Sequence, residues 1–290
     1  MSPCHTDLFW HNITQMNLLS KVKAIFARYP VLKIILPILL SLIFLVLVFK
    51  FVGVGANSES SDVASDESTD LRDLDAKDRP YIGLVPRADG HALILTITNH
   101  QNFSSLDFEI LYQAGNLQQG SIGQIDLTKS AYKTEITLGA CSKGVCRYDD
   151  DVKTGSLKLN GVKNKKQFTA TIPFVLEKIT PEASNIIGPA GTLDIEIPSG
   201  SVTNDYYVLL AETLGVPIPV GNLKGQTVAI FSIAPKLNRP AVIKLKDQDI
   251  TGLKVNHFDF SQNTWSALET NVENGNQFNS DYLGLFAFTQ

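Results

Sequence analysis

The chain has 290 residues, with 25 Lys and Arg against 29 Asp and Glu, and its formal net charge is −4. At about 100–150 residues per domain, this length allows two domains in addition to a membrane anchor. No basic patch with interleaved aromatic residues is present, which argues against a nucleic-acid partner.

An uncharged apolar run lies near the N-terminus. Residues 34–49 read IILPILLSLIFLVLVF, and residues 31–55 reach membrane length if Lys33 and Lys50 extend toward the headgroups. The sequence therefore predicts one transmembrane helix, which contacts the lipid bilayer through residues 31–55. A buried core helix is the alternative, and it is disfavoured because a soluble helix does not need apolar residues on every face.

Charge on either side of this segment predicts its orientation. The tail of residues 1–30 is basic, whereas acidic residues follow the apolar run. Lys and Arg are retained on the cytoplasmic side, so we expect a single-pass plasma-membrane protein with a cytoplasmic N-terminus and an extracytoplasmic C-terminus. Val54-Gly55-Ala56 also resembles a signal-peptidase site, and cleavage after Ala56 would release a soluble form. An uncleaved signal anchor is favoured because Lys50 interrupts the apolar run before that site.

Residues 56–78 are rich in Ser, Asp and Glu and contain few large apolar residues. Such a composition buries too little surface to offset the entropy of ordering, so a disordered acidic linker is expected.

Residues 79–179 carry strand signals with a period of two and turn residues between them. Short strands at this spacing predict an antiparallel sandwich of immunoglobulin type, although the Trp of that core is absent. The apolar positions are Ala92–Thr98, Leu106, Phe108, Ile110, Tyr112, Tyr132, Ile136, Leu138, Phe168, Ala170, Ile172, Phe174 and Leu176.

Two cysteines within this part are separated by four residues. Cys141 and Cys146 should be oxidised outside the cytoplasm, and Gly144 eases a tight loop between them, so we expect a structural disulfide. A redox pair is the alternative, although its cysteines are usually separated by two residues. Cys4 is expected to be cytoplasmic and reduced.

Three adjacent carboxylates, Asp149, Asp150 and Asp151, follow the second cysteine. Calcium binding is the functional hypothesis for them. An exposed acidic turn is favoured, because neighbouring residues on a strand point to opposite faces. No metal ion and no cofactor are otherwise expected.

The stretch Leu138-Gly-Ala-Cys-Ser-Lys-Gly-Val-Cys-Arg-Tyr148 resembles a Leu-Gly-x-Cys-Ser-x-Gly-x-Cys-x-Tyr pattern of bacterial envelope proteins. In those proteins the pattern occurs in a β-rich domain behind one membrane anchor. The resemblance implies a location in the bacterial envelope and no particular activity.

Residues 180–290 also consist of strand signals, broken at Gly215–Pro219 and Asn238–Pro240. Their order resembles the zona-occludens/netrin-receptor (ZU) sandwich and its bacterial surface relatives. The residues that carry the resemblance are Gly191-Thr-Leu193, Ile197-Pro198, Phe231-Ser-Ile-Ala-Pro235, Pro240-Ala-Val-Ile-Lys244 and Phe258-Asp-Phe-Ser-Gln-Asn-Thr-Trp265. The resemblance implies a second β-sandwich. The complete expectation for the fold is all-β, with two antiparallel β-sandwich domains, Ig-like and then ZU-like, after one N-terminal transmembrane helix.

Some ZU relatives cleave their own backbone at His-Phe-Ser. The corresponding stretch here resembles Gln277-Phe278-Asn279-Ser280, which lacks the histidine, so self-cleavage is not expected. His257, the only histidine of this part, is interpreted as a structural residue.

No catalytic motif is apparent, so we expect a non-enzymatic binding, adhesion or envelope-assembly protein with an extracellular protein or glycan ligand. One alternative is a cell-envelope carbohydrate hydrolase that uses dispersed carboxylates, and the other is a purely structural spacer. The candidate carboxylates are Asp107, Glu109, Asp194 and Glu196.

Overall fold

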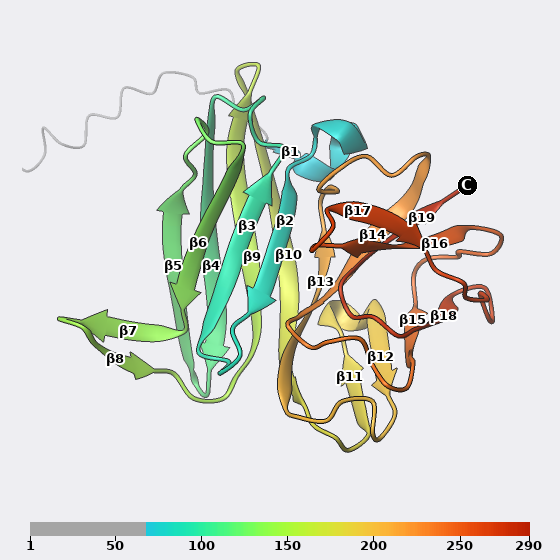
Figure 1. Ribbon diagram of the computed structural model, residues 1–290. Helices are drawn as coiled ribbons and strands as arrows, with labels where there is room; N and C mark the ends of the chain where they lie inside the picture. The colour runs from blue at the N-terminus through green and yellow to red at the C-terminus, as the bar shows by residue number, and fades with distance from the viewer. Residues whose placement is uncertain (1–67) are drawn as a thin grey trace, which may run out of the picture. The chain divides into compact units, whose positions relative to one another are not determined.

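The computed structural model describes residues 68–290, which form antiparallel sheets with three short 3-10 turns (Figure 1). The all-β fold class is thus confirmed for this part of the chain. The tail of residues 1–30, Cys4, the helix expected at residues 31–55, the cleavage site after Ala56 and the linker to residue 67 lie outside the described residues. Between residues 68 and 290, no helix is long and apolar enough to cross a membrane.

The first half of the described part has two facing layers of strands. One layer is a three-stranded sheet in the order β2-β3-β6, and the other is the portion of the main sheet in the order β10-β9-β4-β5. Side chains from both layers share one apolar core, which includes Leu95, Ile97, Ile110 and Leu159. The strands are β2 (Tyr81–Pro86), β3 (Ala92–Thr98), β4 (Ser105–Ala114), β5 (Leu117–Gln124), β6 (Ala131–Thr137), β7 (Gly139–Ser142), β8 (Val145–Tyr148), β9 (Val152–Lys163) and β10 (Lys166–Ile179).

The second half places a four-stranded sheet, in the order β11-β12-β15-β18, against the remaining strands of the main sheet. A second core includes Val208, Ile230, Ile243, Phe278 and Phe286. The elements are β11 (Ser184–Ile187), η4 (Pro189–Gly191), β12 (Leu193–Ile197), β13 (Tyr206–Thr213), β14 (Leu223–Ser232), β15 (Ala241–Leu245), β16 (Lys254–Asp259), β17 (Thr264–Ala267), β18 (Gln277–Ser280) and β19 (Leu285–Thr289).

The main sheet continues across the boundary expected between residues 179 and 180. Strand β10 pairs with β9 over its first part and with β13 over its last part, where Leu176 lies opposite Leu209. Neighbouring residues of β13 then serve different cores, because Leu209 packs into the first and Leu210 into the second. Strands covered on both faces have continuous apolar runs instead of alternation, which explains the stretch from Val208 to Ala211.

The last part of the stretch expected as a disordered linker is folded. Residues 69–78 form β1 (Thr69–Asp70), η2 (Leu71–Asp73) and η3 (Ala76–Asp78), and β1 pairs in parallel with β10. Leu71 is fully buried in the first core, and Lys163 pairs with Asp78 at 3.3 Å. One buried leucine and a few specific polar contacts therefore order a segment whose composition alone predicts disorder.

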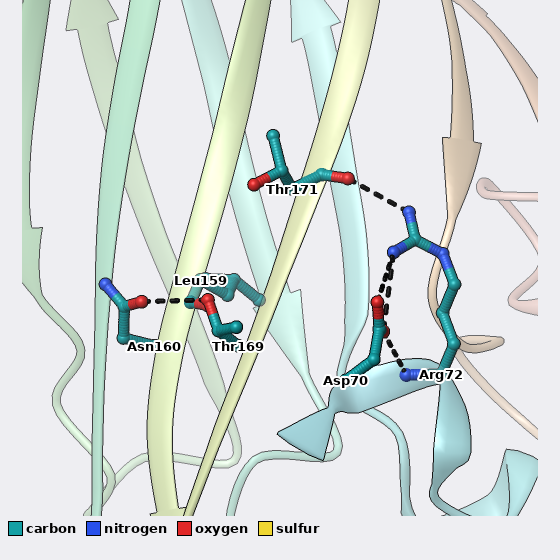
Figure 2. Close-up of polar contacts among 6 residues, drawn as sticks. All are labelled: Asp70, Arg72, Leu159, Asn160, Thr169 and Thr171. Carbon is teal, nitrogen blue, oxygen red and sulfur yellow. Dashed lines mark hydrogen bonds and ion pairs between the residues drawn. The ribbon is translucent and has the colours of Figure 1, made fainter. Parts of the chain in front are cut away.

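Figure 2 shows how this segment is held against β10. The carboxylate of Asp70 accepts hydrogen bonds from the backbone N–H and the guanidinium of Arg72, and the same guanidinium donates to the carbonyl oxygen of Thr171 at 3.0 Å. On the neighbouring strands, the Thr169 hydroxyl donates to the side chain of Asn160. These contacts fix the direction in which the chain enters the first sandwich.

Candidate functional site

The disulfide expected between Cys141 and Cys146 is present, and it joins the two strands of the β7–β8 hairpin. The hairpin projects away from the two sheets of the first half (Figure 1). Its tip is exposed, with Val145 75 % accessible, and Lys143 and Gly144 both adopt positive φ angles. The disulfide therefore closes an exposed hairpin that lies outside the apolar cores.

The base of this hairpin is held by a phenol. The hydroxyl of Tyr112 donates to the Asp149 carboxylate at 2.8 Å and accepts from the N–H of Gly139 at 2.9 Å. Burial and the Asp149 charge raise the pKa of Tyr112 to about 12, so the phenol keeps its proton. Beside it, the ring of Tyr148 stacks on His91 with centroids 4.3 Å apart.

The carboxylates Asp149, Asp150 and Asp151, considered from the sequence for calcium, have different partners in the structure. Asp149 is bound to Tyr112, and Asp151 turns away at a φ of 55° to pair with Lys153 at 3.3 Å. Within residues 68–290, no group of three or more His, Cys, Asp or Glu side chains is arranged to hold a metal ion. The three residues lie in the turn between β8 and β9, and the positive φ of Asp151 directs its side chain away from Asp149.

The four carboxylates considered for glycoside hydrolysis belong to two different sheets. Asp107 and Glu109 are on β4, and Asp107 accepts a hydrogen bond from Asn160. Asp194 and Glu196 are on β12, where they pair with Lys246 and Lys244 of the neighbouring chain segment. The structure therefore does not bring Asp107 and Glu109 together with Asp194 and Glu196.

A cleft with a volume of about 1070 Å³ lies among the C-terminal strands and loops. Its walls come from four segments of the chain: residues 234–240, 257–261, 266–273 and 279–283. The β16–β17 hairpin, which forms one wall, is the last pair of the main sheet. Sequence reasoning did not find this cleft, because it depends on loops that meet only in the folded chain.

Two exposed aromatic rings lie in the cleft. Phe260 is 49 % accessible and meets the buried Phe258 edge to face at 4.9 Å. Tyr282 is 37 % accessible and carries the Lys236 ammonium 5.1 Å from its ring centroid. Contacts with neighbouring side chains hold both rings in place, so a ligand that packs against them loses little side-chain entropy of the protein.

The ring beneath Tyr282 is that of His257, whose centroid is 4.9 Å away. His257 is 9 % exposed, and its Nε2 donates to the carbonyl oxygen of Leu283 at 3.3 Å. Burial lowers the pKa of His257, so the imidazole is neutral at pH 7. A side chain at Gly284, where φ is 146°, would lie 2.8 Å from the same nitrogen. His257 thus supports the loop that presents Tyr282.

Polar groups complete the lining. Ser266, Glu269 and Asn271 are exposed on the cleft wall, and their side chains make no hydrogen bond to residues 68–290. Asp259 instead accepts hydrogen bonds from Ser261 and Gln262, which hold its pKa below the ordinary value. The cleft therefore combines ring faces with hydrogen-bonding groups around a carboxylate that stays ionised.

Ser280, the nucleophile considered for self-cleavage, is buried at the edge of this cleft. Its hydroxyl donates to the carbonyl oxygen of Tyr282 and accepts from the backbone N–H of the same residue. His257 is 9 % exposed, and its hydrogen bond goes to Leu283 rather than to Ser280. The hydroxyl thus closes a turn, and no side chain of residues 68–290 is hydrogen-bonded to it as a base.

Comparison of the chain with protein-family models, with curated proteins and with solved structures yields no match.

Proposed function

We propose that this chain is a membrane-anchored binding protein of the bacterial envelope, without catalytic activity, whose C-terminal cleft binds a glycan. The observation that carries the proposal is the cleft itself, in which Phe260 and Tyr282 are exposed beside free polar groups. Sugars have apolar C–H faces that pack on aromatic rings and hydroxyls that need donors and acceptors. A concave site with both features suits such a ligand.

The anchoring and the location rest on the sequence. Basic residues precede the apolar run of residues 31–55, and acidic residues follow it. The Cys141–Cys146 disulfide supports an oxidising compartment outside the cytoplasm. In this proposal the first sandwich is Ig-like and the second is ZU-like, which is supported by the buried positions of Leu193, Ile197 and Phe231 within the motifs quoted above.

The carbohydrate hydrolase is the weaker alternative. A glycosidase needs one carboxyl group with a raised pKa to act as general acid, close to a second carboxylate. In the cleft, hydrogen bonds from Ser261 and Gln262 lower the pKa of Asp259, and Asp281 is paired with Lys236 at 3.2 Å. A carboxylate with a lowered pKa, such as Asp259, suits binding rather than the proton transfer of a general acid.

The binding proposal is tested with the full-length chain in detergent on an array of envelope glycans, followed by calorimetry on the strongest ligand. Phe260→Ala and Tyr282→Ala should each weaken binding about tenfold, the loss expected for one stacked ring. Ile122→Ala, which removes an exposed side chain far from the cleft, should bind normally. Absence of any glycan ligand, or equal binding by all variants, contradicts the proposal, and shortened glycan products would favour the hydrolase.

The location is tested separately by protease treatment of intact cells that express the chain with a tag at each terminus. We expect a shed C-terminal fragment that carries an oxidised Cys141–Cys146 loop, while the N-terminal tag stays with the membrane. A protected C-terminal tag with free thiols would place both sandwiches in the cytoplasm.

A further inference from the structure

Strand β5, Leu117–Gln124, is a long free edge of the main sheet. It ends the strand order, and its sequence LQQGSIGQ contains no charged residue and no proline. Leu117 and Ile122 are 64 % and 79 % accessible. Proteins usually protect such an edge with charges, proline or a bulge, because its free backbone groups can pair with another strand. Because β5 has no charge and no proline, its free edge can pair with a further strand.

The other free edges of the described sheets differ from β5. Strand β6 carries Lys133 and Glu135, and β2 is almost fully buried. The edge strands β7, β8, β11, β17 and β18 each have four residues, half the length of β5. Strand β5 is therefore the one that pairs most readily with a further strand among residues 68–290.

The hydrogen-bond pattern shows which backbone groups of β5 are free. The N–H of Ile125 donates to the carbonyl oxygen of Leu106 at 2.9 Å, and hydrogen-bonded pairs alternate along an antiparallel ladder. The odd-numbered residues of β5 therefore bond to β4. Gln118, Gly120, Ile122 and Gln124 direct their N–H and C=O groups toward the free edge.

Two glycines leave room beside this edge. The side chain of Leu111 lies against Gly120, and that of Phe108 lies against Gly123, so that a Cβ at either glycine would come within 2.7 Å of them. A large side chain that arrives opposite either glycine from a pairing strand would meet an apolar neighbour. It would not meet a competing Cβ.

We propose that β5 pairs antiparallel with β5 of a second copy of this chain, about a two-fold axis at Ser121. This register places Ile122 of each copy opposite Gly120 of the other, next to Leu111. It also places Gln119 opposite Gly123 and Gln118 opposite Gln124. Each glycine then faces a larger residue, the free backbone groups pair with one another, and the uncharged strand meets no like charge across the axis.

A second copy is favoured over an unrelated extended peptide because the sequence is complementary to its own reversed copy. A strand that recruits a foreign peptide commonly offers pockets or charges for the side chains of that peptide. The exposed residues of β5 offer none. Its small and large residues are instead spaced so that a two-fold axis at Ser121 places each glycine of one copy opposite a larger residue of the other.

The affinity between two copies should be low in solution. A single strand pair buries less surface than a stable interface, which buries about 1,000 Å² or more. If the chains share one membrane, a step that rests on the proposed function, their effective concentration rises and pairing is favoured. Strand β5 and the β16–β17 hairpin of the cleft are at opposite ends of the main sheet. Pairing thus leaves both clefts open and creates a bivalent receptor.

The test is disulfide trapping of the full-length chain, in cell membranes and in detergent, with Cys4→Ser as background. At the proposed axis the two Ser121 Cα atoms would lie about 4.5 Å apart, within the range of a disulfide. Ser121→Cys should therefore form a covalent homodimer at least tenfold faster than Thr171→Cys, an exposed position in the middle of the same sheet. Adding Ile122→Lys should reduce trapping by at least tenfold, whereas adding Val145→Lys at the equally exposed hairpin tip should not.

Equal trapping at residues 121 and 171, or trapping that Ile122→Lys leaves unchanged, would overturn the proposal. Trapping of Ser121→Cys to a different protein in cells would also overturn it, in favour of a foreign strand. Glycan binding by the Ile122→Lys variant is measured in parallel. A monomeric variant that still binds the glycan at its cleft separates a failure of pairing from a failure of the binding function.

Discussion

The phenol of Tyr112 on β4 reaches the carboxylate of Asp149, 37 residues further along the chain, and donates to it at 2.8 Å. The same oxygen accepts the N–H of Gly139, so one hydroxyl joins the two ends of the β7–β8 hairpin to the main sheet. The hairpin makes few other contacts with the sheets, because its strands are almost entirely exposed. Its orientation should therefore depend on Tyr112.

Tyr112→Phe should lower the free energy of unfolding by about 1 kcal/mol, the net value of one lost hydrogen bond of a buried side chain. Amide exchange of residues 139–149 should rise more than exchange elsewhere, because both ends of the hairpin are released. Tyr132→Phe is the matched control, since the Tyr132 hydroxyl makes no hydrogen bond within residues 68–290. Equal effects of the two substitutions would show that the phenol does not hold the hairpin.

Removal of the disulfide should act locally. Cys141→Ala/Cys146→Ala frees an exposed hairpin, so we expect faster amide exchange at residues 139–148. A disulfide that closes so short a loop reduces the entropy of the unfolded chain, and this stabilises the folded state by about 2 kcal/mol at most. If the freed hairpin also disorders in the native state, both states gain similar entropy and the urea midpoint should barely move. A large loss of stability would mean that the hairpin contributes to folding of the sandwich.

Sequence analysis found the strands whose apolar residues either alternate or form a continuous run. In β3 and β10 the apolar residues alternate because Leu95 and Phe174 point into the core while their neighbours face out. Strand β5 has no such alternation, since nearly all its residues are exposed, and no pattern marked it as a strand. Pairing partners such as β4 determine a strand of that kind, and they are not visible in local sequence.

Contacts between residues distant in sequence also explain why the continuous main sheet and the cleft were not predicted. The pairing of β10 with β13 depends on residues brought together across the turn and β11–β12, so the continuous sheet is not evident from periodicity. The cleft depends on loops around Lys236, Asp259, Asn271 and Tyr282, and no local motif joins them. By contrast, the disulfide could be predicted, because Cys141 and Cys146 are close in sequence and the loop between them contains a glycine.

The ordered segment before the first sandwich should contribute to its stability. Leu71→Ala removes a fully buried side chain and should lower the free energy of unfolding by about 2–5 kcal/mol, as for other leucines in a core. Leu117→Ala, at a position that is 64 % accessible, should change it by less than about 0.5 kcal/mol. Both values are measured by urea denaturation of the full-length chain. Similar small effects would mean that residues 69–78 detach from β10 in solution.

His257 should make the stability of the C-terminal half depend on pH. Burial lowers its pKa from the ordinary 6.5, while the hydrogen bond to Leu283 and the charge of Asp259 act in the opposite direction and do not cancel the effect. Between the two pKa values the unfolded chain binds more protons than the folded chain, so stability must rise with pH there. The contribution is therefore complete above pH 6.5 and is lost as the pH falls through the lowered pKa of the folded state.

His257→Gln tests this dependence, because the amide does not titrate and keeps a donor for Leu283. Urea midpoints measured from pH 8 to pH 5 should fall less steeply for the variant than for the unsubstituted chain below pH 6.5. The two curves should be parallel above it, where both side chains are neutral. Because His257 also supports Tyr282, glycan binding by the unsubstituted chain should weaken over the same acidic range. Parallel curves at all pH values would show that the imidazole is accessible to protons in the folded chain and does not couple the cleft to pH.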